Sequence, residues 1–150
     1  MLFRSLAGAC TAALVWSTMV LQAQPSARLS VVAPAPGTPV RRQVLGAVRS
    51  ALQITSQFKV AHLAVWGSFA FVRAGEVVAD GEQLQETDLF VEALLEQRAG
   101  QWVVRELWNL STHPDGEAHE AFLRRVGNHQ RTQGIPLALF PHDLRATIRP

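Results

Sequence analysis

The spacing of apolar residues changes along this chain from a helical period to a strand-like one, and this change constrains the fold most. Over residues 39–54, apolar side chains recur every three to four positions. Thr38 is a suitable N-cap and Pro39 fits the first helical turn, where its missing N–H costs nothing. We therefore predict a helix over residues 39–54, with one face made of Val40, Val44, Val48 and Leu52.

The middle of the chain is rich in β-forming residues, and turn signals divide it. Residues 75–86 are polar and are predicted to be irregular, with a tight turn at Asp80-Gly81. A helix followed by an antiparallel meander gives an α+β fold, in which the N-terminal helix packs on a curved four-stranded sheet. The stretches predicted as strands are 58–66, 69–74, 87–97 and 102–110.

The C-terminal part returns to a helical pattern. We predict a short helix over residues 115–126, because Ala118, Phe122 and Val126 share one side of it. Residues 134–141 are apolar and interrupted by two prolines, so they are predicted to form an irregular strap over one end of the sheet. Residues 39–150 are thus expected to form a single α+β domain, with the N-terminal helix as the main cover of the sheet.

The first 23 residues have the layout of a secretory signal peptide. Arg4 precedes an uncharged stretch over residues 6–21, and Ala23 is followed by Gln24-Pro25. A retained membrane anchor is the alternative, but this stretch is short for a spanning helix, which needs about 20 apolar residues. We expect an exported protein, periplasmic or secreted, with no stable membrane span after processing and a Pro-rich extended leader over residues 24–38.

Cysteine usage and charge exclude several functions. The only cysteine, Cys10, lies inside the predicted signal peptide, so the processed chain would contain no disulfide and no thiolate site. The formal net charge is +2, and the arginines are scattered rather than gathered into a stripe. We therefore do not expect a nucleic-acid partner. The sequence also contains no phosphate-binding loop and no nucleophile motif, and we expect no cofactor.

The hairpin predicted around residues 98–101 offers a candidate acid–base pair. If Gly100 forms a bulged turn, Gln97 pairs with Gln101, and Glu92 then lies opposite Glu106. Two carboxylates in direct register repel each other, and in a partly buried pocket such a pair can act as acid and base. The alternative is two solvated glutamates relieved by neighbouring arginines. A shift of one residue in the register removes the pairing.

Histidines are the second set of candidates. His62 lies in a predicted strand among apolar neighbours, where it would bind a ligand group in the helix–sheet cleft or be a hydrogen-bonded core residue. His113, His119 and His129 lie close in sequence, but their spacing gives no common face for a metal ion. We interpret these three as surface residues and expect no metal site.

Aromatic residues concentrate in the predicted strands and form either the core or a ligand platform on the concave side of the sheet. The candidate ligand-binding residues are Trp102, Trp108, Phe90 and Arg73. The arginines of the first helix are most simply a solvated face, or they would meet an anionic partner. They are Arg41, Arg42 and Arg49.

Several short motifs resemble those of small exported bacterial proteins of unknown function. They are the Pro-rich lead into an Arg-bearing helix, GSFAFVR at 67–73, GQWVV at 100–104 and LALF at 137–140. The resemblance implies a helix plus four-stranded sheet of cystatin-like or nuclear-transport-factor-two-like layout over residues 36–141. Those proteins commonly have an acidic residue where Ser68 stands, and the resemblance implies no catalytic residue.

These features predict an exported binding or interaction module that holds a small ligand or a protein partner. The site would be the sheet cleft or the exposed sheet face. The alternative is a small cone-fold enzyme for proton transfer or hydrolysis, using His62 and the Glu92/Glu106 pair. Such an enzyme needs a deep cleft with one of these residues buried beside another titratable group. A homodimer through a sheet edge is a third interpretation.

Overall fold

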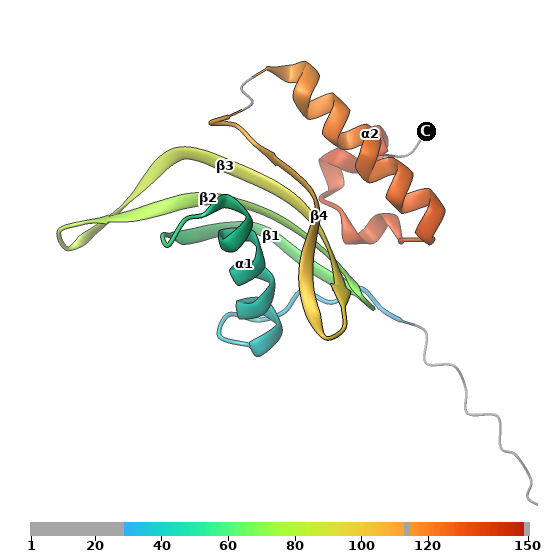
Figure 1. Cartoon of the computed structure of the whole chain (residues 1–150), viewed down its shortest axis with the longest axis horizontal. Helices are drawn as coiled ribbons and strands as arrows, with labels where there is room; N and C mark the ends of the chain where they lie inside the picture. The colour runs from blue at the N-terminus through green and yellow to red at the C-terminus, as the bar shows by residue number, and fades with distance from the viewer. Residues whose placement is uncertain (1–28, 113–114, 149–150) are drawn as a thin grey trace, which may run out of the picture.

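The computed structural model describes residues 29–112 and 115–148 (Figure 1). The predicted signal peptide over 1–23, with Cys10, lies outside these residues, as does His113. Within them, no helix is long and apolar enough to cross a membrane. The elements are α1 (Pro39–Leu52), β1 (Gln57–Trp66), β2 (Phe69–Asp80), β3 (Gln83–Arg98), β4 (Gln101–Asn109), α2 (Gly116–Gln133), the 3-10 turns η1 (Leu137–Leu139) and η2 (His142–Leu144), and α3 (Arg145–Ile148).

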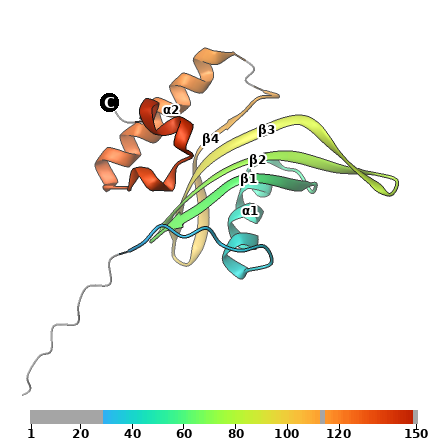
Figure 2. The same ribbon diagram turned by 180° about the vertical axis from the view of Figure 1, so that it is seen from behind.

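The predicted α+β fold is confirmed. The strands form one antiparallel sheet in the order β1-β2-β3-β4. The sheet curves around α1, while α2 and the C-terminal turns lie on its other side (Figures 1 and 2). Helix α1 begins at Pro39, as predicted, and ends at Leu52 because Gln53 adopts a left-handed conformation at φ 56°.

The sheet carries a hydrophobic core on each face. Phe71 and Val72 are adjacent in β2 and therefore face opposite ways, and both are 0% exposed. On the α1 side, Val72 packs in a cluster with Val44 and Val48. On the other side, Phe71 packs with residues of α2, η1 and α3, which are Phe122, Leu123, Val126, Leu139 and Ile148. Helix α2 is thus a second cover of the sheet and extends to Gln133, beyond the predicted end at residue 126.

Strands β2 and β3 continue through residues 75–86, which were expected to be irregular. Their pairing runs from Val77↔Glu86 to Asp80↔Gln83, so the loop is the two residues Gly81 and Glu82. Gly81 has φ +61°, as the first position of a type II′ hairpin turn requires. The polar sequence of this part is explained by its position, because the far end of the hairpin extends away from both helices (Figure 1).

The register predicted for the β3–β4 hairpin is wrong. Arg98 pairs with Gln101, so the loop contains only Ala99 and Gly100. Both loop residues have positive φ, 48° and 78°, as in a type I′ turn. A bulged turn would also place Gly100 at positive φ, and for this reason the glycine alone does not distinguish the two registers.

A β-bulge changes the register of β4 a second time. Leu95 pairs with Val104 and Leu94 with Glu106, which leaves Arg105 as the extra residue. Glu92 therefore lies opposite Trp108, and the predicted pairing of Glu92 with Glu106 does not form. The other edge strand, β1, also contains a register shift, and bulges in edge strands are a common protection against edge-to-edge association.

The described part of the leader lies along the edge of β1. The N–H of Val32 donates to the carbonyl of Val65 at 2.9 Å, and the reverse bond is 2.8 Å long. Trp66 Nε1 donates to the carbonyl of Leu29 at 3.0 Å. The β-bridge between Val32 and Val65 remains isolated, because Pro34 and Pro36 have no N–H with which to continue the ladder.

Candidate functional site

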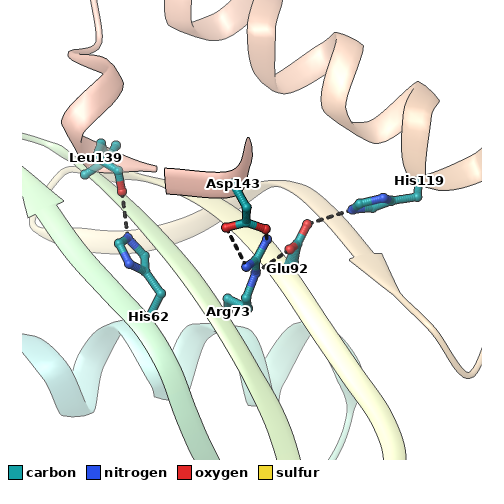
Figure 3. Close-up of polar contacts among 6 residues, drawn as sticks. All are labelled: His62, Arg73, Glu92, His119, Leu139 and Asp143. Carbon is teal, nitrogen blue, oxygen red and sulfur yellow. Dashed lines mark hydrogen bonds and ion pairs between the residues drawn. The ribbon is translucent and has the colours of Figure 1, made fainter. Parts of the chain in front are cut away.

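Four side chains that the sequence singles out form a row across the sheet. His62 of β1 pairs with Arg73 of β2, Arg73 with Glu92 of β3, and Glu92 with Trp108 of β4. We call these four residues the polar row. It lies on the face covered by α2 and the C-terminal turns, and Figure 3 shows three of its members with their partners.

Glu92 is a buried carboxylate with both oxygens engaged. Its side chain contacts Arg73 Nε through Oε1 at 2.6 Å and His119 Nε2 through Oε2 at 2.8 Å (Figure 3). The residue is only 1% exposed. An ionised carboxylate accepts but does not donate, so Nε2 of His119 carries the proton of this bond. The negative charge is therefore paired and hydrogen-bonded, as a buried charge has to be.

Arg73 connects the polar row to the C-terminal segment. Its Nη1 and Nη2 donate to Oδ1 and Oδ2 of Asp143 in η2, at 3.0 and 2.9 Å. Burial of the guanidinium lowers the pKa of Arg73, but the hydrogen bonds and charges of Asp143 and Glu92 outweigh this effect and raise it above its ordinary value. Arg73 thus holds one carboxylate from the sheet and one from the segment that covers it.

Acidification is expected to loosen this contact. The hydrogen bond from Arg73 lowers the pKa of Asp143 below its ordinary value of 3.8. The stability that the pair contributes is therefore present above pH 3.8 and is lost as the pH falls through the lower pKa of the folded state. Amide hydrogen exchange of η2 measured against pH should show less protection in acid. In the Asp143→Asn variant this change should be absent, and an identical acid profile for both proteins would contradict the assignment.

His119 of α2 contacts the polar row through aromatic rings as well as through Glu92. Its ring lies 4.3 Å from the ring of Trp108 between centroids, and it stacks on Phe122 at 6.1 Å. Phe90 meets the edge of Trp108 at 6.4 Å. Trp108 Nε1 is buried without a hydrogen-bond partner in the structure. Two of the aromatic candidates, Trp108 and Phe90, therefore pack in the core on the α2 side.

His62 does not enter the cleft beside α1. A bulge between Val60 and His62 turns the histidine to the opposite face, where its Nε2 lies 2.9 Å from the carbonyl oxygen of Leu139 (Figure 3). Its ring also meets Phe71 at 6.2 Å between centroids. His62 is thus a hydrogen-bonded, part-buried residue that contacts η1.

Glu106 forms a second anchor for α2. It accepts hydrogen bonds from Arg125 Nε at 2.6 Å and from His129 Nε2 at 3.1 Å. His119 and His129 both face the sheet, so their interpretation as surface residues is wrong. Neither belongs to a group of potential metal ligands within residues 29–112 and 115–148, where no such group occurs.

Two partners in these contacts could not be identified from the sequence. Asp143 is 70 residues from Arg73, and Arg125 is 19 residues from Glu106. Both lie in the C-terminal helical segment, whose docking on the sheet determines the contacts. No local sequence signal marks either residue.

An open groove of about 560 Å³ lies on the other side of the sheet, between α1 and the first half of β4. Trp102 is in its wall and is 8% exposed, and its Nε1 is buried without a hydrogen-bond partner in the structure. Of the four candidate ligand-binding residues, only Trp102 lines this groove. The other lining residues are Gln43, Gly46, Ala47, Ser50, Ala51, Gly100, Gln101, Val103 and Val104, and none of them is charged.

Comparison of the chain with protein-family models, with curated proteins and with solved structures finds no match. Function has therefore to be inferred from the polar row and the groove. The polar row contains titratable side chains, among them His62, which also lines a smaller groove of about 380 Å³, whereas the larger α1–β4 groove contains no charged residue. The polar row and the α1–β4 groove lie on opposite faces of the sheet.

Proposed function

We propose that this protein is an exported binding module that holds a small, uncharged ligand in the groove between α1 and β4. The observation that carries the proposal is the uncharged lining of this groove, which lies on the opposite face of the sheet from the polar row. The titratable side chains of the polar row, His62, Arg73 and Glu92, are engaged by the C-terminal segment, whereas the groove is lined by uncharged residues alone.

The contacts of the polar row disfavour the enzyme alternative. A general acid or base has to reach a substrate proton directly or through one water molecule. Glu92 uses both oxygens for Arg73 and His119, and Glu106 uses both for Arg125 and His129. The bonds to His119, Arg125 and His129 hold α2 against the sheet. We infer that Glu92 and Glu106 stabilise the fold and do not take part in catalysis.

The lining of the groove supports an uncharged, partly apolar ligand. Small residues of α1, among them Gly46 and Ala47, leave room beside Trp102, whose ring offers an aromatic wall. Gln43, Ser50 and Gln101 provide polar groups at the rim. A charged ligand would find no partner among these residues, so its desolvation would not be offset. Apolar walls with a few polar groups are typical of small-molecule sites.

Export remains part of the proposal. It is supported by the charged start, the uncharged stretch and Ala23 near the predicted cleavage position. It is also supported by the position of the single cysteine, because Cys10 would be removed with the signal peptide. The processed chain would then need no thiol chemistry in an oxidising compartment.

Titration with N-phenyl-1-naphthylamine, an uncharged fluorescent probe, tests the proposal. We expect saturable binding and amide shifts in a 15N–1H NMR spectrum at Gly46 and Gly100. Ser50 is exposed on the rim, so Ser50→Phe should fill the groove and weaken binding about tenfold without unfolding the protein. The matched Ser50→Ala variant should bind like the original protein. Shifts confined to other surfaces, or equal affinity for both variants, would refute the proposed site.

A further inference from the structure

The far end of the β2–β3 hairpin stands free of the rest of the domain. We call residues 78–86 the arm. All nine residues are exposed, and because alternate residues of a strand face opposite sides, neither face of the arm is covered. β1 begins at Gln57, opposite Val77, and β4 ends at Asn109, opposite Val91, so both edges of the arm lie beyond the neighbouring strands. Figure 1 shows the arm projecting past α1.

The arm carries a concentrated negative charge. Residues 74–97 contain seven of the 12 carboxylates of the chain and none of its 14 lysines and arginines. Glu92 and Glu96, in the body of the sheet, are paired with arginines. In the arm, Asp80, Glu82 and Glu86 are exposed, and Lys59 is the one cation within the described residues that pairs with any of them. The charge of the arm is therefore largely uncompensated from within the chain.

Apolar side chains lie among these carboxylates. Leu84 is 61% exposed and Val78 is 37% exposed, and no helix covers either side chain. They line a groove of about 330 Å³ together with Ser56, Gln57 and Ala79. The groove lies where β1 begins, beside the part of β2 that has no β1 partner. An exposed leucine on an unsupported ribbon contributes little to folding, and apolar surface rimmed by charge is typical of a protein-interaction site.

We propose that the arm is the docking surface for a basic protein partner, whose extended segment adds to the free edge of β2 beyond Val77. One apolar side chain of the segment enters the groove beside Leu84, and its lysines or arginines pair with Asp80 and Glu82. Charge complementarity identifies the partner as basic, because a negative surface steers and holds positive chains. The open edge specifies an extended conformation, since unpaired backbone groups bind a further strand.

The arm and the α1–β4 groove share no lining residue, so the two sites are independent. If no ligand binds in the α1–β4 groove, the proposal for the docking surface still stands. If no peptide binds to the arm, the proposal for the groove still stands. The docking surface differs in chemistry as well. The arm carries the carboxylates of Asp80, Glu82 and Glu86, whereas no residue that lines the α1–β4 groove is charged.

A synthetic peptide with alternating lysine and valine tests the proposal, with two comparison peptides. The first replaces lysine by glutamate, and the second replaces valine by glycine. Titrated into the 15N-labelled protein, the lysine–valine peptide should shift the amides of residues 78–86, and its affinity should fall about tenfold between about 50 and about 500 mM salt. The glutamate–valine and lysine–glycine peptides should each bind at least about tenfold more weakly.

Substitutions at exposed positions complete the test without a risk of unfolding. Leu84→Gln and Glu82→Gln should each weaken binding of the lysine–valine peptide several-fold. Leu110→Gln is the matched control, because Leu110 is 42% exposed and lies outside both the arm and the α1–β4 groove, and this variant should bind normally. Equal binding of the lysine–glycine peptide, or no effect of Leu84→Gln, would overturn the proposal, as would shifts centred on the α1–β4 groove.

Discussion

Replacement of Glu92 by glutamine should lower the free energy of unfolding by about 3–5 kcal/mol, the usual cost of removing one partner of a buried ion pair. Glutamine has nearly the same shape, so the loss would come from charge rather than from volume. Arg73, whose side chain is 18% exposed, would keep Asp143 but lose its buried partner. His119 would lose the carboxylate that accepts its proton. Urea denaturation followed by circular dichroism measures the change.

The double variant Arg73→Met/Glu92→Leu is the control for this prediction. It removes both buried charges together, and apolar replacements of a buried pair are often neutral or stabilising. We therefore expect it to be more stable than Glu92→Gln. Unchanged or increased stability of Glu92→Gln would mean that the carboxylate is repelled rather than held. A Glu92/Glu106 pair would produce that result. The experiment therefore distinguishes a register with Glu92 opposite Glu106 from the observed one with Glu92 opposite Trp108.

Replacement of Trp102 by alanine should also lower the free energy of unfolding by about 3–5 kcal/mol. Trp102 is nearly buried in the cluster formed by α1 and the sheet, where it packs with Val44 and Leu95. Its removal would leave a cavity beside the α1–β4 groove and would loosen the contact between α1 and β4. Thermal and urea denaturation report the loss.

Trp102→Phe is the matched variant. It keeps most of the packing and removes an indole N–H that has no hydrogen-bond partner in the structure, so it should cost much less than alanine. A loss below about 1 kcal/mol for Trp102→Ala would contradict a core role. It would show instead that the ring is a ligand platform that the fold does not need.

The sequence predicts the fold class because its periodic patterns are strong. The helix beginning at Pro39 carries a complete apolar face, and the strand of residues 58–66 is bounded by clear turn residues. The second cover of the sheet was underestimated because α2 is mostly polar beyond Val126 and is held partly by ion pairs. Apolar periodicity does not detect a helix that docks through charges.

Register was the weakest point of the prediction, because it depends on single residues. The positive φ of Ala99 shortened the loop by one residue, and the bulge at Arg105 added one more shift. Alanine is uncommon at positive φ, and no residue type marks a bulge in advance. The sequence nevertheless singled out His62, Arg73, Glu92 and Trp108. Their arrangement as a row follows from pairings that no local pattern encodes.

The cover on the second face of the sheet has a consequence for the order of folding during synthesis. The sheet and α1 are complete once β4 has been made, whereas α2 and the C-terminal turns are made after it. Until then Phe71, Leu94 and Trp108 have no helix over them, although all three are buried in the finished protein. A chain that ends near residue 115 would present this surface to water, where such surfaces promote aggregation. Residues 116–148 therefore cover the apolar face of the newly made sheet.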